Sequence, residues 1–186
     1  MDNTTLIIIG VAVIAVAFVA IVLWAVARSR QEKHLKETFG TEYDATYADA
    51  VDRKAAKQEL KAREERVKHY DLQPISGEQR LAFLSEWQNM QASFVEHPGT
   101  AVNRADQLLA EVMRARGYES SMGDPGERIA DVSVGHGDEA GAFREAAEIA
   151  KLNRQGRATT EDLRRAIQDY GVVFDSLLNE RQAAAT

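Results

Sequence analysis

Four histidines and several pairs of adjacent carboxylates are the residues of this chain best suited to acid–base or metal chemistry. None of the histidines stands at the spacing of a known metal motif from another histidine or from an acid, and H-E-x-x-H is absent. We therefore expect each of them to lie on the surface or in a loop. The four are His34, His69, His97 and His136.

The adjacent carboxylates have a simpler explanation than catalysis. Asp138 and Glu139, like Glu161 and Asp162, stand where a helix is predicted to start, and acidic side chains there complement the helix dipole. The chain has no cysteine and no G-x-S-x-G, phosphate-loop or G-x-G-x-x-G motif. We predict no catalytic, cofactor-binding or metal-binding residues and no cofactor, and we expect that the protein is not an enzyme.

The Gly-rich segment 117–137 is the remaining place for a chemical site, because long loops carry function more often than helices do. No set of polar residues within it converges on a recognisable chemistry. An enzyme with an unfamiliar site is therefore the least favoured of the functional interpretations.

Charge is distributed unevenly along the chain. The net charge is −6, of which residues 28–36 carry +3 and residues 1–27 carry −1, so the remainder carries −8. Affinity for nucleic acid comes mainly from clustered Lys and Arg. The acidic main domain therefore argues against nucleic acid as a partner.

The elements that would position any site begin with an apolar run over residues 6–27, which contains no charged side chain. At about 1.5 Å per residue, a helix of this length crosses the roughly 30 Å hydrocarbon core of a membrane. A cleavable signal peptide ending at Ala25-Val26-Ala27 is the alternative, and the protein would then be secreted. Signal peptides have a shorter apolar region after a basic segment, whereas this chain begins MDNTT. We predict a retained transmembrane helix over 6–27 after an extracytoplasmic tail over 1–5.

Basic residues follow this run and none precedes it, so the positive-inside rule places the N-terminus outside and the C-terminal side in the cytoplasm. The basic residues belong to a juxtamembrane segment over 28–40, and tryptophan is enriched at membrane interfaces. The predicted membrane-interface residues are Trp24, Arg28, Arg30, Lys33 and Lys36.

A charged helix is predicted over residues 41–71. Acid-before-base pairs four residues apart, such as Glu59 and Arg63, stabilise a helix, while its apolar residues form only a thin stripe. We interpret it as a mostly solvated spacer. Phe39, Tyr43 and Tyr47 also lie four apart, and we expect them to pack on the protein itself rather than to dock on lipid or a partner.

Four amphipathic patterns follow over residues 72–179 and predict a small bundle of about four helices. Caps are expected at Ser76 with Gln79, at Thr100, and at Thr159 with Asp162. The first helix is expected to bury Leu81, Leu84, Trp87, Phe94 and Val95. A later one is expected to bury Ala140, Phe143, Ala146, Ala147 and Ala150. The clearest face belongs to the last helix, with Leu163, Ala166, Ile167, Tyr170, Phe174, Leu177 and Leu178. The fold class is therefore all-α, and residues 180–186 form a frayed tail.

Several stretches together resemble a group of uncharacterised bacterial proteins, single-span by prediction and sometimes labelled secreted. The resemblance covers most of the chain after Lys36. It implies a bacterial envelope protein with a helical domain, and it assigns no activity or catalytic residue. This chain departs from the family pattern in having His136-Gly137 in place of His-Pro, and FREAA in place of a Tyr-Arg-x-Ala-His run. The matching stretches are FGTEYDATY, KQELKAREERVKHYDLQPIS, FVEHPGTAVNRADQLLAEVMRARGY, IADVSVGH and TTEDLRRAIQDYGVVFDSLL.

These patterns favour a single-pass protein of the bacterial inner membrane whose helical bundle acts as a scaffold or adaptor for a protein partner in the cytoplasm. The alternative is a domain that senses a lipid or small ligand in a pocket between bundle helices near Trp87.

Overall fold

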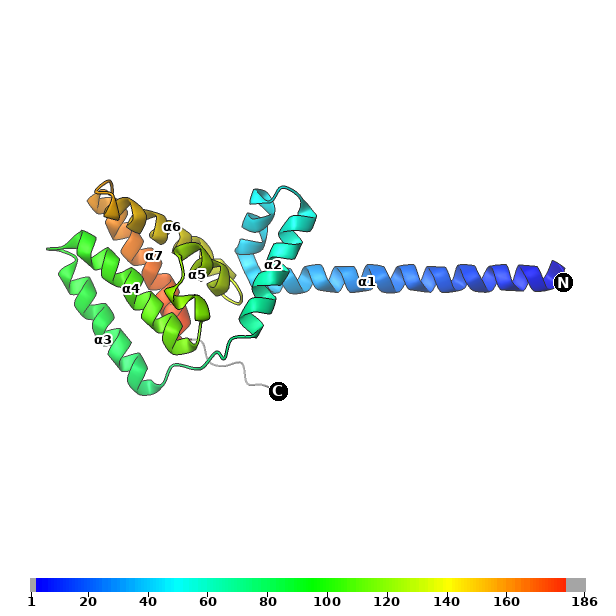
Figure 1. Cartoon of the computed structure of the whole chain (residues 1–186), viewed down its shortest axis with the longest axis horizontal. Coiled ribbons are helices and arrows are strands. Elements are labelled where there is room, and N and C mark those ends of the chain that lie inside the picture. Colours follow the sequence, from blue (N-terminus) through cyan, green and yellow to red (C-terminus); the bar gives the residue numbers. More distant parts are fainter. Residues whose placement is uncertain (1–2, 180–186) are drawn as a thin grey trace. The chain divides into compact units, whose positions relative to one another are not determined.

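The computed structural model describes the backbone of residues 3–179 and the side chains of residues 16–27 and 29–179 (Figure 1). Over this range the chain forms seven α-helices and one 3-10 helix, and the described residues contain no strand. The all-α fold class predicted from the sequence is therefore confirmed. The chain divides into two compact units, Met1–Glu37 and Thr38–Thr186.

The first unit is the beginning of helix α1, which runs from Asn3 to Asp49 and is interrupted by a non-helical kink at Gly40. Its apolar side chains from Val16 to Val26 are exposed. Among the residues that the structure describes, no helix has the length and apolar character needed to cross a membrane. The expected tail over 1–5 and the first ten residues of the expected span over 6–27 lie outside the described side chains.

The second unit begins with a helical hairpin where the sequence predicted a single solvated spacer helix. The end of α1 stops at Asp49, and α2, Arg53–Lys68, runs back beside it (Figure 1). Asp52 caps α2 by accepting a hydrogen bond of 2.7 Å from the backbone N–H of Ala55. We call residues 38–68 the hairpin. The prediction of a continuous spacer helix over 41–71 was wrong. The chain turns at residues 50–52, and a new helix, α2, begins there with Asp52 as its cap.

The thin apolar stripe of the hairpin is buried rather than solvated. Ala56 and Leu60 of α2 are completely buried, and so is Phe39, while Tyr43 is nearly so. Tyr43 and Tyr47 stack with their ring centroids 4.4 Å apart. The aromatic residues therefore pack on the protein, as expected, and the hairpin buries its own apolar stripe.

The rest of the second unit is the predicted bundle. Helix α7, Thr160–Asn179, packs against both α6, Gly137–Arg154, and α4, Pro98–Arg116, and α3, Gly77–Ser93, packs on α4. Every residue predicted for the core faces of α6 and α7 is buried. Burial of these faces in one shared core holds the four helices together.

The capping predictions were confirmed at two helices and wrong at a third. Ser76 and Gln79 form the reciprocal capping box of α3. At α7, Asp162 accepts a hydrogen bond of 3.0 Å from the backbone N–H of Thr159. Helix α4 begins at Pro98 rather than after Thr100, because proline has no N–H to leave unsatisfied in the first turn.

Helix α3 and its C-cap pack on the core through three of the five predicted residues, Leu84, Trp87 and Phe94. Trp87 is buried and stacks on Phe174 of α7 with centroids 4.5 Å apart, and Met90 is buried one turn later. Leu81 and Val95, which were expected on the core face, are 70% and 87% exposed.

The segment 117–137 connects α4 to α6 and is partly helical. It contains the 3-10 helix η1, Glu119–Met122, and the helix α5, Pro125–Val132. Arg128 anchors α5 because its buried guanidinium pairs at 2.8 Å with Asp106 of α4. Tyr170 of α7 donates a hydrogen bond of 3.1 Å to the same carboxylate. This packing holds α5 in place.

Candidate functional site

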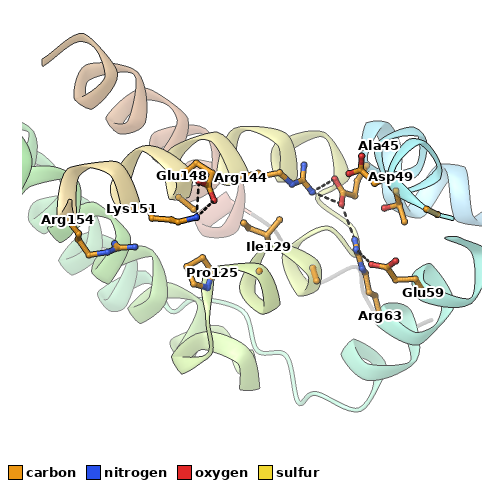
Figure 2. A pocket seen from close by; sticks show the side chains of 16 residues that line it. Ala45, Asp49, Glu59, Arg63, Pro125, Ile129, Arg144, Glu148, Lys151 and Arg154 are labelled. Atoms are coloured by element: carbon orange, nitrogen blue, oxygen red, sulfur yellow. Dashed lines mark hydrogen bonds and ion pairs between the residues drawn. The ribbon is translucent and has the colours of Figure 1, made fainter. Parts of the chain in front are cut away.

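A cleft of about 540 Å³ lies among the hairpin, α5 and α6, entirely within the second unit (Figure 2). Its size falls in the range of small-molecule and peptide sites. The side chains that line it come from segments far apart in the sequence. They are Glu42, Ala45, Thr46, Asp49, Ala50, Glu59 and Arg63 of the hairpin, Pro125, Gly126, Ile129 and Ala130 of α5, and Arg144, Ala147, Glu148, Lys151 and Arg154 of α6.

A buried carboxylate joins two sides of this cleft. The Glu42 side chain is only 3% exposed, and Arg63 donates to it at 3.0 Å from within the hairpin. Nη2 of Arg144, on α6, lies 2.8 Å from each of the two Glu42 oxygens. A buried charge needs such partners because its desolvation is costly. The three residues therefore fix the hairpin against the bundle at one end of the cleft.

The two charged walls of the cleft have opposite sign. The α6 wall carries three bases, Arg144, Lys151 and Arg154, and one acid, Glu148, for a charge of +2. The hairpin wall carries one base and three acids, for a charge of −2. These four are Arg63, Glu42, Asp49 and Glu59.

Small apolar residues and one unsatisfied hydroxyl complete the lining. Ala147 and Ile129 are almost fully buried. Thr46 is 6% exposed, and within the described part of the chain its hydroxyl oxygen has no hydrogen-bond partner. Buried hydroxyls nearly always have a partner, so this buried oxygen is an exception within the described structure.

A second buried carboxylate fixes the other end of the hairpin to α5. Asp131 is completely buried, accepts a hydrogen bond of 2.8 Å from Nε of Arg66, and accepts one of 2.6 Å from the hydroxyl of Tyr70. Burial and the hydrogen bond to this carboxylate raise the pKa of Tyr70 to about 12. The hairpin and the segment after it are thus attached to the bundle at two carboxylates, Glu42 and Asp131.

The histidines do not meet in a site. His34, His69 and His97 are exposed and His136 lies in the loop before α6, as expected, although its side chain is buried. Its Nδ1 lies 2.8 Å from the hydroxyl of Ser176. That hydroxyl donates its proton to Glu139 at 2.9 Å, so the serine is not oriented as a nucleophile toward the histidine.

The described side chains also include no group of three or more His, Asp or Glu residues placed to hold a metal ion.

The predicted membrane-interface residues lie in the first unit and take no part in the cleft. Trp24 is 63% exposed, and Arg30, Lys33 and Lys36 are exposed on α1. The side chain of Arg28 lies outside the described residues.

Sequence reasoning missed the cleft. Glu59 and Arg63 were interpreted as a pair on a solvated helix, and they do form that ion pair. The same Arg63 guanidinium also reaches Glu42, 21 residues away, and Arg144 reaches it from 102 residues away. No local spacing signals such contacts.

Comparison of the chain with protein-family models, with curated proteins and with solved structures gives no match.

Proposed function

We propose that this chain is a single-span, membrane-tethered helical interaction module, whose cleft among the hairpin, α5 and α6 docks a segment of a protein partner at the cytoplasmic face of a bacterial inner membrane. The observation that carries the proposal is the cleft itself. One wall, on the hairpin, is acidic, and the other, on α6, is basic. Two buried carboxylates hold the hairpin to the bundle. A fixed scaffold with exposed, charged walls is suited to recognition, because its binding groups are already in place.

The tether is supported by the sequence at the N-terminus. The uncharged run over 6–27 has the length of a membrane span, and basic residues follow it without any before it. Trp24 and the basic side chains of the juxtamembrane segment would then lie at the cytoplasmic interface. A reporter active only outside the cytoplasm, fused after Thr186, should give no signal, and strong reporter activity would contradict this topology.

Docking in the cleft can be tested in living cells by site-specific photo-crosslinking of the full chain. A photoreactive residue at Ala45 or Ala130, both of which line the cleft, should yield a discrete adduct. The matched control is Gln88, which is exposed on α3 and does not line the cleft. Adducts that form equally at Gln88, or none at the two cleft positions, would overturn the proposal.

The ligand-sensing alternative moves to the same cleft, since Trp87 is packed against Phe174. The volume of the cleft is the observation that favours it. A bound small molecule that co-purifies with the full chain and is detected by mass spectrometry would support this alternative.

A further inference from the structure

The opposite charges of the cleft walls point to the chemistry of its occupant. We infer that the cleft binds an extended peptide segment in which acidic and basic residues alternate, with the acids toward α6 and the bases toward the hairpin. The inference rests on the proposed docking function and specifies the class of partner segment. A purely acidic segment would meet the carboxylates of the hairpin wall, and a purely basic one would meet the cations of α6.

Helix α6 offers hydrogen-bond donors that the described protein does not use. Arg144 contacts Glu42 through Nη2 alone, and among described residues no partner is found for its Nη1 or Nε. Arg154 is exposed and forms no ion pair within residues 16–179. Figure 2 shows Arg144, Lys151 and Arg154 in a row along α6. Ten residues separate the two arginines, which is about 15 Å along a helix axis.

The hairpin wall offers carboxylates in the same way. Asp49 is exposed and has no ion pair in the described part of the chain. Glu59 is 53% exposed although it pairs with Arg63. Both acids line the cleft, and they would accept hydrogen bonds from lysine or arginine side chains of an occupant.

An extended peptide matches this arrangement through its twofold periodicity. Successive side chains of an extended chain point to opposite sides, so alternating charges place all acids on one side and all bases on the other. At about 3.3 Å per residue, two acids four residues apart span about 13 Å, close to the spacing of the two α6 arginines. A helical occupant is about 10–12 Å wide and needs roughly ten residues for the same distance.

The test measures binding of labelled peptides to the full chain in a nonionic detergent by fluorescence anisotropy. The probe is a peptide of four Glu-Lys repeats, and the matched control has the same composition arranged as four Glu followed by four Lys. We expect the alternating peptide to bind at least tenfold more tightly at about 0.1 M salt, where charges beyond about 10 Å are screened. Arg154→Glu and Asp49→Lys should each weaken its binding at least fivefold. Arg164→Glu, which breaks an exposed pair on α7 outside the cleft, should not.

Three results would overturn the inference: equal affinity for the two arrangements, tighter binding of a peptide of eight glutamates, or no binding of the alternating peptide up to 1 mM. If peptide binding fails while crosslinks from Ala130 persist in cells, the sequence class is wrong and docking stands. If both fail, the proposed function falls as well.

Discussion

Arg144 on α6 and Glu42 on the hairpin are 102 residues apart in sequence, yet one Nη2 atom of the arginine lies 2.8 Å from both oxygens of the buried carboxylate. Arg63 donates to the same carboxylate from the other side. Because Arg144 contacts Glu42 through Nη2 alone, its Nε and Nη1 have no partner among the described residues. The contact joins the hairpin to α6 and leaves donors that the proposed occupant of the cleft could use.

Replacing Glu42 with glutamine should destabilise the second unit by about 1–3 kcal/mol. The change leaves two arginines beside a neutral group, but the Arg144 side chain is 45% exposed, so solvent screens part of the loss. Urea denaturation followed by circular dichroism gives the free energy of unfolding. Glu148→Gln is the control, since its pair with Lys151 is exposed on both sides and should change stability by less than about 0.5 kcal/mol. Equal effects of the two substitutions would contradict the role given to Glu42.

Gly137→Ala should destabilise the protein strongly. A Cβ at this position would lie 1.7 Å from the carbonyl oxygen of Phe39, so the backbones of the hairpin and α6 would have to separate. We expect a loss of more than about 2 kcal/mol in thermal or urea unfolding. Gly141→Ala, one turn later in the same helix, meets nothing within 4 Å and should be neutral or stabilising by up to about 1 kcal/mol. Similar free energies of unfolding for the two variants would contradict the close approach of Gly137 to the Phe39 carbonyl.

The Tyr70 hydroxyl predicts a specific loss of stability at alkaline pH. Its pKa of about 12 in the folded state lies above the ordinary value of 10, because burial and Asp131 favour the protonated phenol. Its contribution to stability is therefore fully present below pH 10 and is lost as the pH rises from 10 toward 12.

The measurement compares the free energies of unfolding of wild type and Tyr70→Phe at pH 9 and pH 11. The free energy of unfolding by which wild type exceeds Tyr70→Phe should be smaller at pH 11 than at pH 9. Tyr170, whose pKa is also raised by burial and by Asp106, is present in both proteins and cancels. An advantage that stays constant or grows would contradict the hydrogen bond to Asp131.

Truncation at two positions tests whether the hairpin belongs to the domain. A fragment of residues 38–186 should unfold cooperatively, because it comprises the whole second unit. A fragment that starts at Leu72 loses Arg66 and Tyr70, the partners of Asp131, and the covering of α5. Its urea midpoint should be lower by roughly 1 M or more. Equal midpoints would show that the domain begins at residue 72, as the sequence predicted, and that the hairpin does not stabilise it.

The bundle was predictable because its signals are local. The face of α7 repeats at helical spacing, and the Ser76–Gln79 box marks the start of α3 within four residues. Where local rules competed, the prediction was wrong: Thr100 is a good cap, but Pro98 already starts α4. At α3, Leu84, Trp87 and Phe94 pack on the core as predicted, whereas Leu81 is left exposed.

The hairpin and the cleft were not predictable for a physical reason. Helix α2 is so strongly charged that its buried residues, such as Ala56 and Leu60, give only a faint stripe. Docking of the hairpin depends on buried carboxylates whose partners are 65 residues away for α2 and 102 residues away for the end of α1. Those pairs arise only once the hairpin has turned at residues 50–52.

The most direct test of the central claim, that a partner docks in the cleft, is the yield of the in-cell crosslink from Ala130 in wild type and in Arg154→Glu. Arg154 is exposed and forms no ion pair in the described part of the chain, so its reversal should leave the fold and the amount of protein unchanged. The account predicts that the adduct falls at least tenfold in Arg154→Glu, while Arg164→Glu retains it. An unchanged yield in Arg154→Glu, at equal protein levels, would contradict docking in this cleft.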